Sequence, residues 1–157
     1  MHVEIIRSTR RRKTIHAEMR NGAVRLSIPA TLSKAEEQHW ATVMVQRFER
    51  RRQTSTVDLM QRARQLAARY DLPEPERITW SERQTSLWGS CTPGHGTIRI
   101  SARLASYPRW VLDYVIVHEL AHLRYRSHGP RFRGLVERFP LAERAKGFLI
   151  AKGLEEG

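Results

Sequence analysis

Cysteine is almost absent from this chain: its 157 residues include a single one, Cys91, so no internal disulfide can form. No apolar run approaches the roughly 20 residues that a membrane-spanning helix needs. The N-terminal residues also lack the apolar core of a secretory signal peptide. Together these absences predict a cytoplasmic protein that has no membrane partner.

Acidic residues are scarce as well. The chain has 16 Asp and Glu against 28 Lys and Arg, a formal net charge of +12, with basic runs at residues 10–13 and 50–52. Such a balance attracts polyanions, so nucleic acid is a candidate partner through the basic surface. No recognised nucleic-acid-binding motif accompanies the charge, and a solvated Arg-rich surface explains it more simply. The sequence leaves the oligomeric state open.

The N-terminal region has the pattern of a small antiparallel β unit. Residues 3–7 and 14–19 have β character, and residues 23–29 alternate apolar and polar side chains. Asn21 and Gly22 between the last two segments are typical of a two-residue hairpin turn. We therefore expect an N-terminal β-hairpin extension over residues 1–32.

The remainder, residues 33–157, is expected to form one further domain that is rich in helices. Ser33 and Glu36 have the spacing of a capping box, which predicts a helix from there to about Arg52. The other predicted helices cover residues 56–70, 107–126, 130–139 and 141–152, and the predicted strands cover residues 77–80, 87–91 and 97–101. We expect the last two strands to form a hairpin, and the fold class to be α+β with one small antiparallel sheet.

The most informative segment is His118-Glu119-Leu120-Ala121-His122, which lies within a predicted helix. Residues i and i+4 share a helix face, so both imidazoles can bind one Zn²⁺. Glu119 beside them can take a proton from a water molecule, as in the H-E-x-x-H hydrolases. The alternative is a helix whose two His and one Glu share a hydrogen-bond network without a metal.

A catalytic zinc usually has three protein ligands and one open position. His128 follows in a segment whose Gly129 and Pro130 predict the end of one helix and the start of another. That turn can bring His128 back toward the metal. The competing third ligand is Glu137 on the next helix, and we favour His128 because a turn gives an imidazole few other roles.

Two segments resemble a known family. Residues 115–123, followed by His128 and Phe132, look like the metal-binding region of the YgjP-like metallopeptidase-domain family, and Trp88-Gly89-Ser90-Cys91 resembles its W-G-S-C segment. This family is related to the SprT-like and WLM zinc peptidases. One departure is Arg133, where the family leads us to expect a bulky aromatic residue.

The resemblance implies a zincin-like fold with the small sheet beside the metal-binding helix. It also implies one Zn²⁺ per chain with His118, His122 and His128 as ligands, and Glu119 as the catalytic acid and base. Gly89 lies in a predicted strand, where glycine suggests that another chain approaches closely. Trp88, Gly89 and Ser90 are therefore candidate substrate-binding residues, at which a peptide could add as an extra strand.

The predicted activity is that of a zinc metallopeptidase of the H-E-x-x-H type acting on peptides or proteins. Two alternatives remain at this point. One is a zinc-dependent hydrolase of nucleotides or other phosphoanhydrides, in which the Arg residues around the motif would hold phosphates. The other is a basic nucleic-acid-associated module whose zinc is structural.

Overall fold

The computed structural model describes residues 1–84 and 86–156. The chain forms two compact units, Met1–Arg52 and Gln53–Gly157, which are described separately below. Helix α1 (Lys34–Ser55) begins in the first unit and ends in the second. Among the described residues, no helix has both the length and the apolar character needed to cross a membrane. The division of the chain at residue 33 stays a prediction.

The first unit contains a three-stranded sheet in the order β1-β3-β2, formed by β1 (Val3–Ser8), β2 (His16–Arg20) and β3 (Ala23–Pro29). The β2–β3 hairpin is antiparallel, and Asn21 and Gly22 have positive φ angles of 51° and 77°, as the predicted turn requires. Strand β1 pairs with β3 in parallel, so the expectation of a wholly antiparallel unit is wrong. The reason is that β1 lies on the far edge of β3 and is not a neighbour of β2.

Helix α1 begins as the capping box predicts. The Ser33 hydroxyl accepts a hydrogen bond from the Glu36 N–H at 3.1 Å, and the Glu36 carboxylate accepts one from the Ser33 N–H at 3.3 Å. The helix runs to Ser55 rather than ending near Arg52, since the polar residues there include no Gly or Pro to break it. Helix α2 (Leu59–Tyr70) then starts at Asp58, whose carboxylate accepts from the Gln61 N–H.

The second unit has a three-stranded sheet in the order β4-β6-β5, formed by β4 (Arg77–Ser81), β5 (Gly89–Thr92) and β6 (Thr97–Ser101). Strands β5 and β6 form the predicted antiparallel hairpin, joined by a short 3-10 turn at Pro93–His95. Strand β4 pairs with β6 in parallel, so the sheet is mixed rather than antiparallel. Strand patterns do not reveal which edge a strand joins, and here β4 joins the edge opposite β5.

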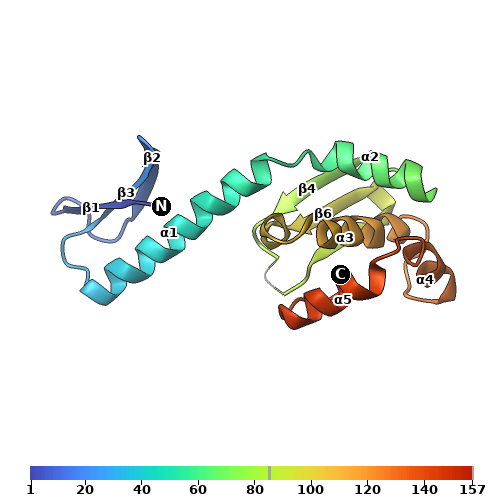
Figure 1. Cartoon of the computed structure of the whole chain (residues 1–157). Coiled ribbons are helices and arrows are strands. Elements are labelled where there is room, and N and C mark those ends of the chain that lie inside the picture. The colour runs from blue at the N-terminus through green and yellow to red at the C-terminus, as the bar shows by residue number, and fades with distance from the viewer. Residues whose placement is uncertain (85, 157) are drawn as a thin grey trace. The chain divides into compact units, whose positions relative to one another are not determined.

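Helix α3 (Arg109–His122) is the centre of the second unit (Figure 1). It packs against the sheet at β5 and β6 and against α2, α4 (Pro130–Val136) and α5 (Ala142–Ala151). Every residue from Val111 to His122 is buried, as expected of a helix that is apolar on all sides. The α+β prediction is confirmed.

The bounds of α3 differ from those predicted. The helix begins at Arg109, with Pro108 at the N-cap position, rather than at residue 107. It ends at His122, four residues before the predicted end. The connection after His122 is consequently longer than expected, and His128 lies within it.

Candidate metal centre

Three histidines converge at the end of α3. His118 and His122 lie one turn apart on that helix, and His128 lies on the connection between α3 and α4. One ligand nitrogen from each of them falls within 4.8 Å of the others. The Nε2 atoms of His122 and His128 are 3.0 Å apart. The three residues predicted as metal ligands therefore lie close enough together to bind a single ion.

The turn that returns His128 to the helix is held by backbone contacts. The N–H of Tyr125 donates to the Ala121 carbonyl, which curls the chain directly after α3. Arg133 in α4 then donates from Nε to the His128 carbonyl at 3.2 Å. Arg133 is the residue that departs from the family pattern, and its contact shows that it supports the loop carrying His128.

The ring of His122 is oriented from two sides. Its Nδ1 lies 3.0 Å from the Tyr125 carbonyl oxygen, an acceptor, so Nδ1 carries the hydrogen. Nε2, the nitrogen that faces His128, is then the one available to a metal. Phe132 stacks on the ring with centroids 4.3 Å apart and an interplanar angle of 27°. Tyr125 thus contributes to the site through its carbonyl oxygen.

His118 lies deeper, at 1 % exposure. Trp88 packs edge-on against it with ring centroids 5.3 Å apart, and Tyr114 does so at 6.0 Å. Trp88 has no exposed surface, and its backbone N–H and carbonyl pair with Glu155 and Ser101. Its indole therefore supports the site from below rather than presenting a surface to a ligand.

Glu119 is fully buried beside these histidines. Among the described residues, neither of its carboxylate oxygens has a hydrogen-bond partner. Burial raises the pKa of Glu119 to about 8, and the nearby negative charge of Glu156 acts in the same direction. Burying a carboxylate without a hydrogen-bond partner costs folding free energy. A role in a reaction or in metal binding therefore explains its presence better than a contribution to stability does.

Gly89 explains how β5 approaches this carboxylate. A Cβ at Gly89 would lie 3.3 Å from both Glu119 Cγ and Val115 Cγ1, and 3.0 Å from the Arg99 carbonyl oxygen. The close neighbour that requires glycine is therefore α3 of the same chain. The next residue, Ser90, accepts a hydrogen bond from Gln84 Nε2 through its hydroxyl at 2.7 Å.

The donor set fits a zinc ion. Two imidazole nitrogens bound tetrahedrally at about 2.0–2.1 Å would be about 3.3 Å apart, close to the distance between His122 and His128. Three histidine ligands leave one position open, which is the pattern of catalytic rather than structural zinc. A zinc ion at this position would also place a positive charge near the buried Glu119 carboxylate.

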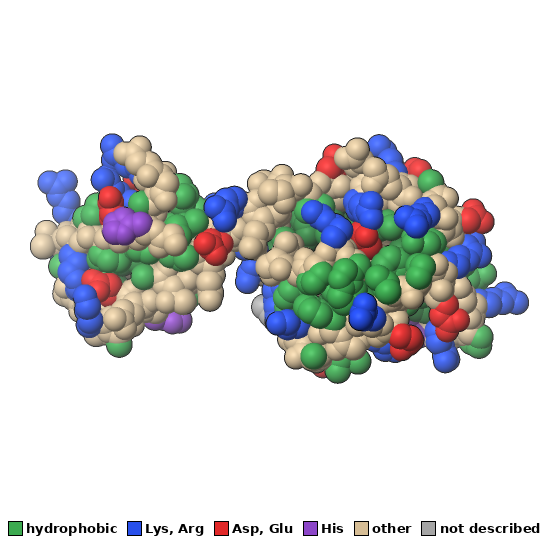
Figure 2. All heavy atoms as spheres, viewed as in Figure 1, with side chains coloured by type: hydrophobic (Ala, Val, Ile, Leu, Met, Phe, Trp, Pro, Cys, Tyr) green, Lys and Arg blue, Asp and Glu red, His purple; other side chains and the backbone are tan. Residues whose placement is uncertain are grey.

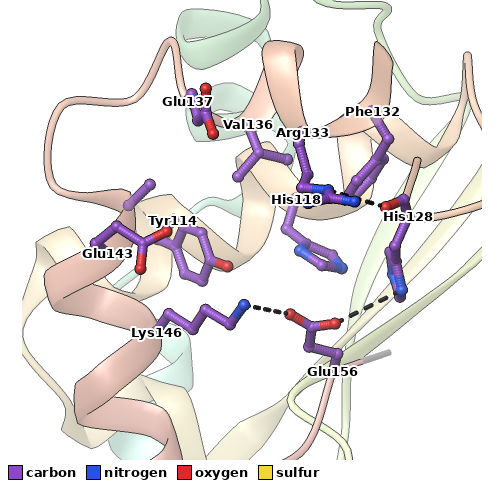
Figure 3. Close-up of a pocket in the computed structure, with 11 residues that line it drawn as sticks. Tyr114, His118, His128, Phe132, Arg133, Val136, Glu137, Glu143, Lys146 and Glu156 are labelled. Carbon is purple, nitrogen blue, oxygen red and sulfur yellow. Dashed lines mark hydrogen bonds and ion pairs between the residues drawn. The ribbon is translucent and has the colours of Figure 1, made fainter. Parts of the chain in front are cut away.

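Other candidates lie apart from the ligand group. Glu137, the alternative third ligand, is not a member of it and instead lines a cavity of about 260 Å³ beside His118 and His128 (Figure 3). Cys91 is also outside the group, and burial followed by the charge of Glu119 raises the pKa of its thiol to about 12. One residue was missed by sequence reasoning: Glu156 lies 3.6 Å from His128, and no motif marks it.

Comparison with known proteins gives the class of this protein, a metallopeptidase. The model of the YgjP-like, metallopeptidase domain family matches residues 5–149, and the chain belongs to this family. A search of curated proteins gives no match.

The fold also resembles a solved structure, that of the metallopeptidase zymogen of Pyrococcus abyssi abylysin. The TM-score is 0.54 at 18 % sequence identity, and the match covers 62 % of this chain and 97 % of that chain. At this identity the likeness supports the fold of the present chain, while the family match supports the peptidase class.

Proposed function

We propose that this metallopeptidase depends on zinc, with His118, His122 and His128 as the ligands of one ion and Glu119 as the general base. The observation that carries the proposal is the convergence of three imidazoles beside a buried glutamate whose oxygens have no hydrogen-bond partner among the described residues. Family membership supplies the peptidase class.

Each protein group has a separate role in the proposed reaction. The zinc, when bound, polarises the scissile carbonyl and lowers the pKa of water from about 15.7 toward about 7. Glu119 accepts the proton of the attacking water and later delivers it to the leaving amine. The Tyr125 carbonyl keeps the His122 ring in its ligand orientation.

We propose that the substrate lies along β5. Among the described residues, β6 is the only strand paired with β5 in the order β4-β6-β5, so Gly89–Thr92 lies at an edge of the sheet. A groove of about 460 Å³ beside it is lined by Cys91, Thr92, His122 and His128, among others. A peptide paired with Gly89 and Ser90 would bring a carbonyl toward the histidines, with Trp88 supporting the strand from beneath.

Glu119→Gln tests the catalytic role. The variant keeps the size of the side chain but cannot accept a proton, so we expect zinc content to be retained and peptide hydrolysis to fall at least 100-fold. Glu137→Gln is the matched control, because Glu137 lines the neighbouring cavity but is not in the ligand group. Equal turnover by Glu119→Gln and the wild type would exclude Glu119 as the base.

The same preparation of wild-type protein distinguishes the peptidase from the two alternative functions. Side-by-side assays on unstructured peptides and nucleoside triphosphates should show zinc-dependent cleavage of the peptides alone. A structural zinc would leave both substrates intact. Figure 2 shows Lys and Arg on the visible face of the larger unit interspersed with Asp and Glu. Nucleic acid as a second partner is proposed from net charge alone.

A further inference from the structure

The three proposed ligands are not equally supported by the fold. His118 and His122 are buried on α3, at 1 % and 7 % exposure, whereas the His128 side chain is 45 % exposed on a loop. An exposed loop imidazole loses rotamer freedom when it binds a metal, and that loss weakens binding. A contact that orients the ring beforehand would reduce this cost.

Glu156 makes such a contact. One of its carboxylate oxygens lies 3.6 Å from His128 Nδ1 (Figure 3). The other ring nitrogen of His128, Nε2, lies 3.0 Å from His122 Nε2. A carboxylate on the Nδ1 side favours the tautomer that carries its hydrogen there. Nε2 is then unprotonated and directed at the position where the other two ligands meet.

Glu156 is itself held in place. Its second carboxylate oxygen lies 3.4 Å from Lys146 Nζ on α5, so the ammonium of Lys146 holds the carboxylate from the side away from His128. The preceding residue is fixed through its backbone: the Glu155 N–H donates to the Ser86 carbonyl, and the Trp88 N–H donates to the Glu155 carbonyl. Leu154 before it is buried at 2 % exposure.

The backbone pairing has a further consequence for the site. Glu155 forms a parallel bridge with Leu87, directly before β5 begins at Gly89. The segment before Glu156 is thereby attached to the residues that lead into β5. Glu156 directly follows this backbone-paired residue.

We propose that Glu156 is a positioning residue for the metal centre: it orients His128 for zinc and thereby raises zinc affinity. This inference rests on the proposed zinc site. Removing a partner of a ligand imidazole typically lowers metal affinity about 10- to 100-fold. Glu156 does not contact the reacting atoms, so its effect on hydrolysis follows from zinc occupancy.

The test is the zinc affinity of the full chain, measured by competition with a chromophoric chelator. We expect Glu156→Gln to bind zinc 10- to 100-fold more weakly than the wild type, and Glu156→Asp, which keeps the charge, to retain more affinity. Glu155→Gln is the matched control, because the described contacts of Glu155 use its backbone. Lys146→Met should give a smaller loss in the same direction.

Thermal unfolding of the metal-free variants separates positioning from structural damage. The metal-free wild type, Glu156→Gln and Glu155→Gln should unfold at the same temperature. Wild-type affinity in Glu156→Gln, or an equal loss in Glu155→Gln, would overturn the role of Glu156 while leaving the proposed function intact. A wild type that binds no zinc would overturn both proposals.

Discussion

At the scale of single residues, the site contains buried polar side chains whose burial costs folding free energy, and a function would explain why they are there. Glu119 is a fully buried carboxylate with a raised pKa, in a helix most of whose buried residues are apolar. Its charge also affects Cys91, a thiol that lies in the groove beside the histidines. The burial that raises the pKa of Glu119 therefore also keeps the Cys91 thiol protonated.

Cys91 should react slowly with alkylating agents in the folded protein. Its pKa is raised from 9.0 to about 12, so the thiol stays neutral at ordinary pH and the thiolate fraction at pH 8.5 is below about one in a thousand. We expect iodoacetamide to react at least 100-fold more slowly with native than with urea-unfolded protein. The native rate should rise about tenfold per pH unit between pH 8 and 10. Similar native and unfolded rates would show that the thiol is not buried as described.

At the scale of elements, the decisive contact is that of β5 with α3. The strand reaches the helix because Gly89 lacks a side chain at the point where Glu119 and Val115 face it. The position of the strand edge and that of the Glu119 side chain are therefore coupled. A substitution at Gly89 changes Glu119 as well as the strand, so it does not report on peptide binding alone.

Gly89→Ala should damage both stability and activity. The new methyl group would lie 3.0 Å from the Arg99 carbonyl and 3.3 Å from Glu119 Cγ, so backbone or glutamate must shift. Overpacking of this kind costs about 1–3 kcal/mol in unfolding free energy, measured by urea denaturation. We expect kcat to fall while zinc stays bound.

Gly94→Ala in the same hairpin is the control, because its Cβ would meet nothing within 4 Å. This variant should match the wild type in unfolding free energy. Equal behaviour of the Gly89 and Gly94 variants would contradict the close approach between β5 and α3.

At the scale of the second unit as a whole, the metal would join two elements that the chain otherwise connects by a loop. His118 and His122 belong to the central helix, while His128 precedes α4. An ion held by all three binds the folded unit and not the unfolded chain. Zinc binding should therefore stabilise residues 53–157 by mass action.

Zinc should raise the unfolding free energy of this unit by about 2.7 kcal/mol when its free concentration is 100-fold above Kd. Differential scanning calorimetry in buffered zinc and after chelation measures the shift, and chelation should also abolish peptide hydrolysis. His128→Ala should lose most of the shift, and His95→Ala should keep it, because His95 is outside the ligand group. A shift of equal size in both variants would exclude His128 as a ligand.

The sequence by itself determined the features that depend on local spacing. The helical interval between His118 and His122, the Asn21-Gly22 turn, the capping box at Ser33 and the β5–β6 hairpin each lie within a few residues, where backbone geometry dictates which side chains meet. The return of His128 was also predictable, because Gly129 and Pro130 mark the turn.

Only the tertiary structure decided the features that join distant segments. The parallel pairing of β1 with β3 and of β4 with β6 depends on which sheet edge each strand occupies, and strand patterns do not encode that choice. The contact of Glu156 with His128 and the approach of α3 to Gly89 likewise depend on packing between elements. Periodicity determines which face a side chain occupies, whereas the neighbour it meets there is determined by how the whole chain packs.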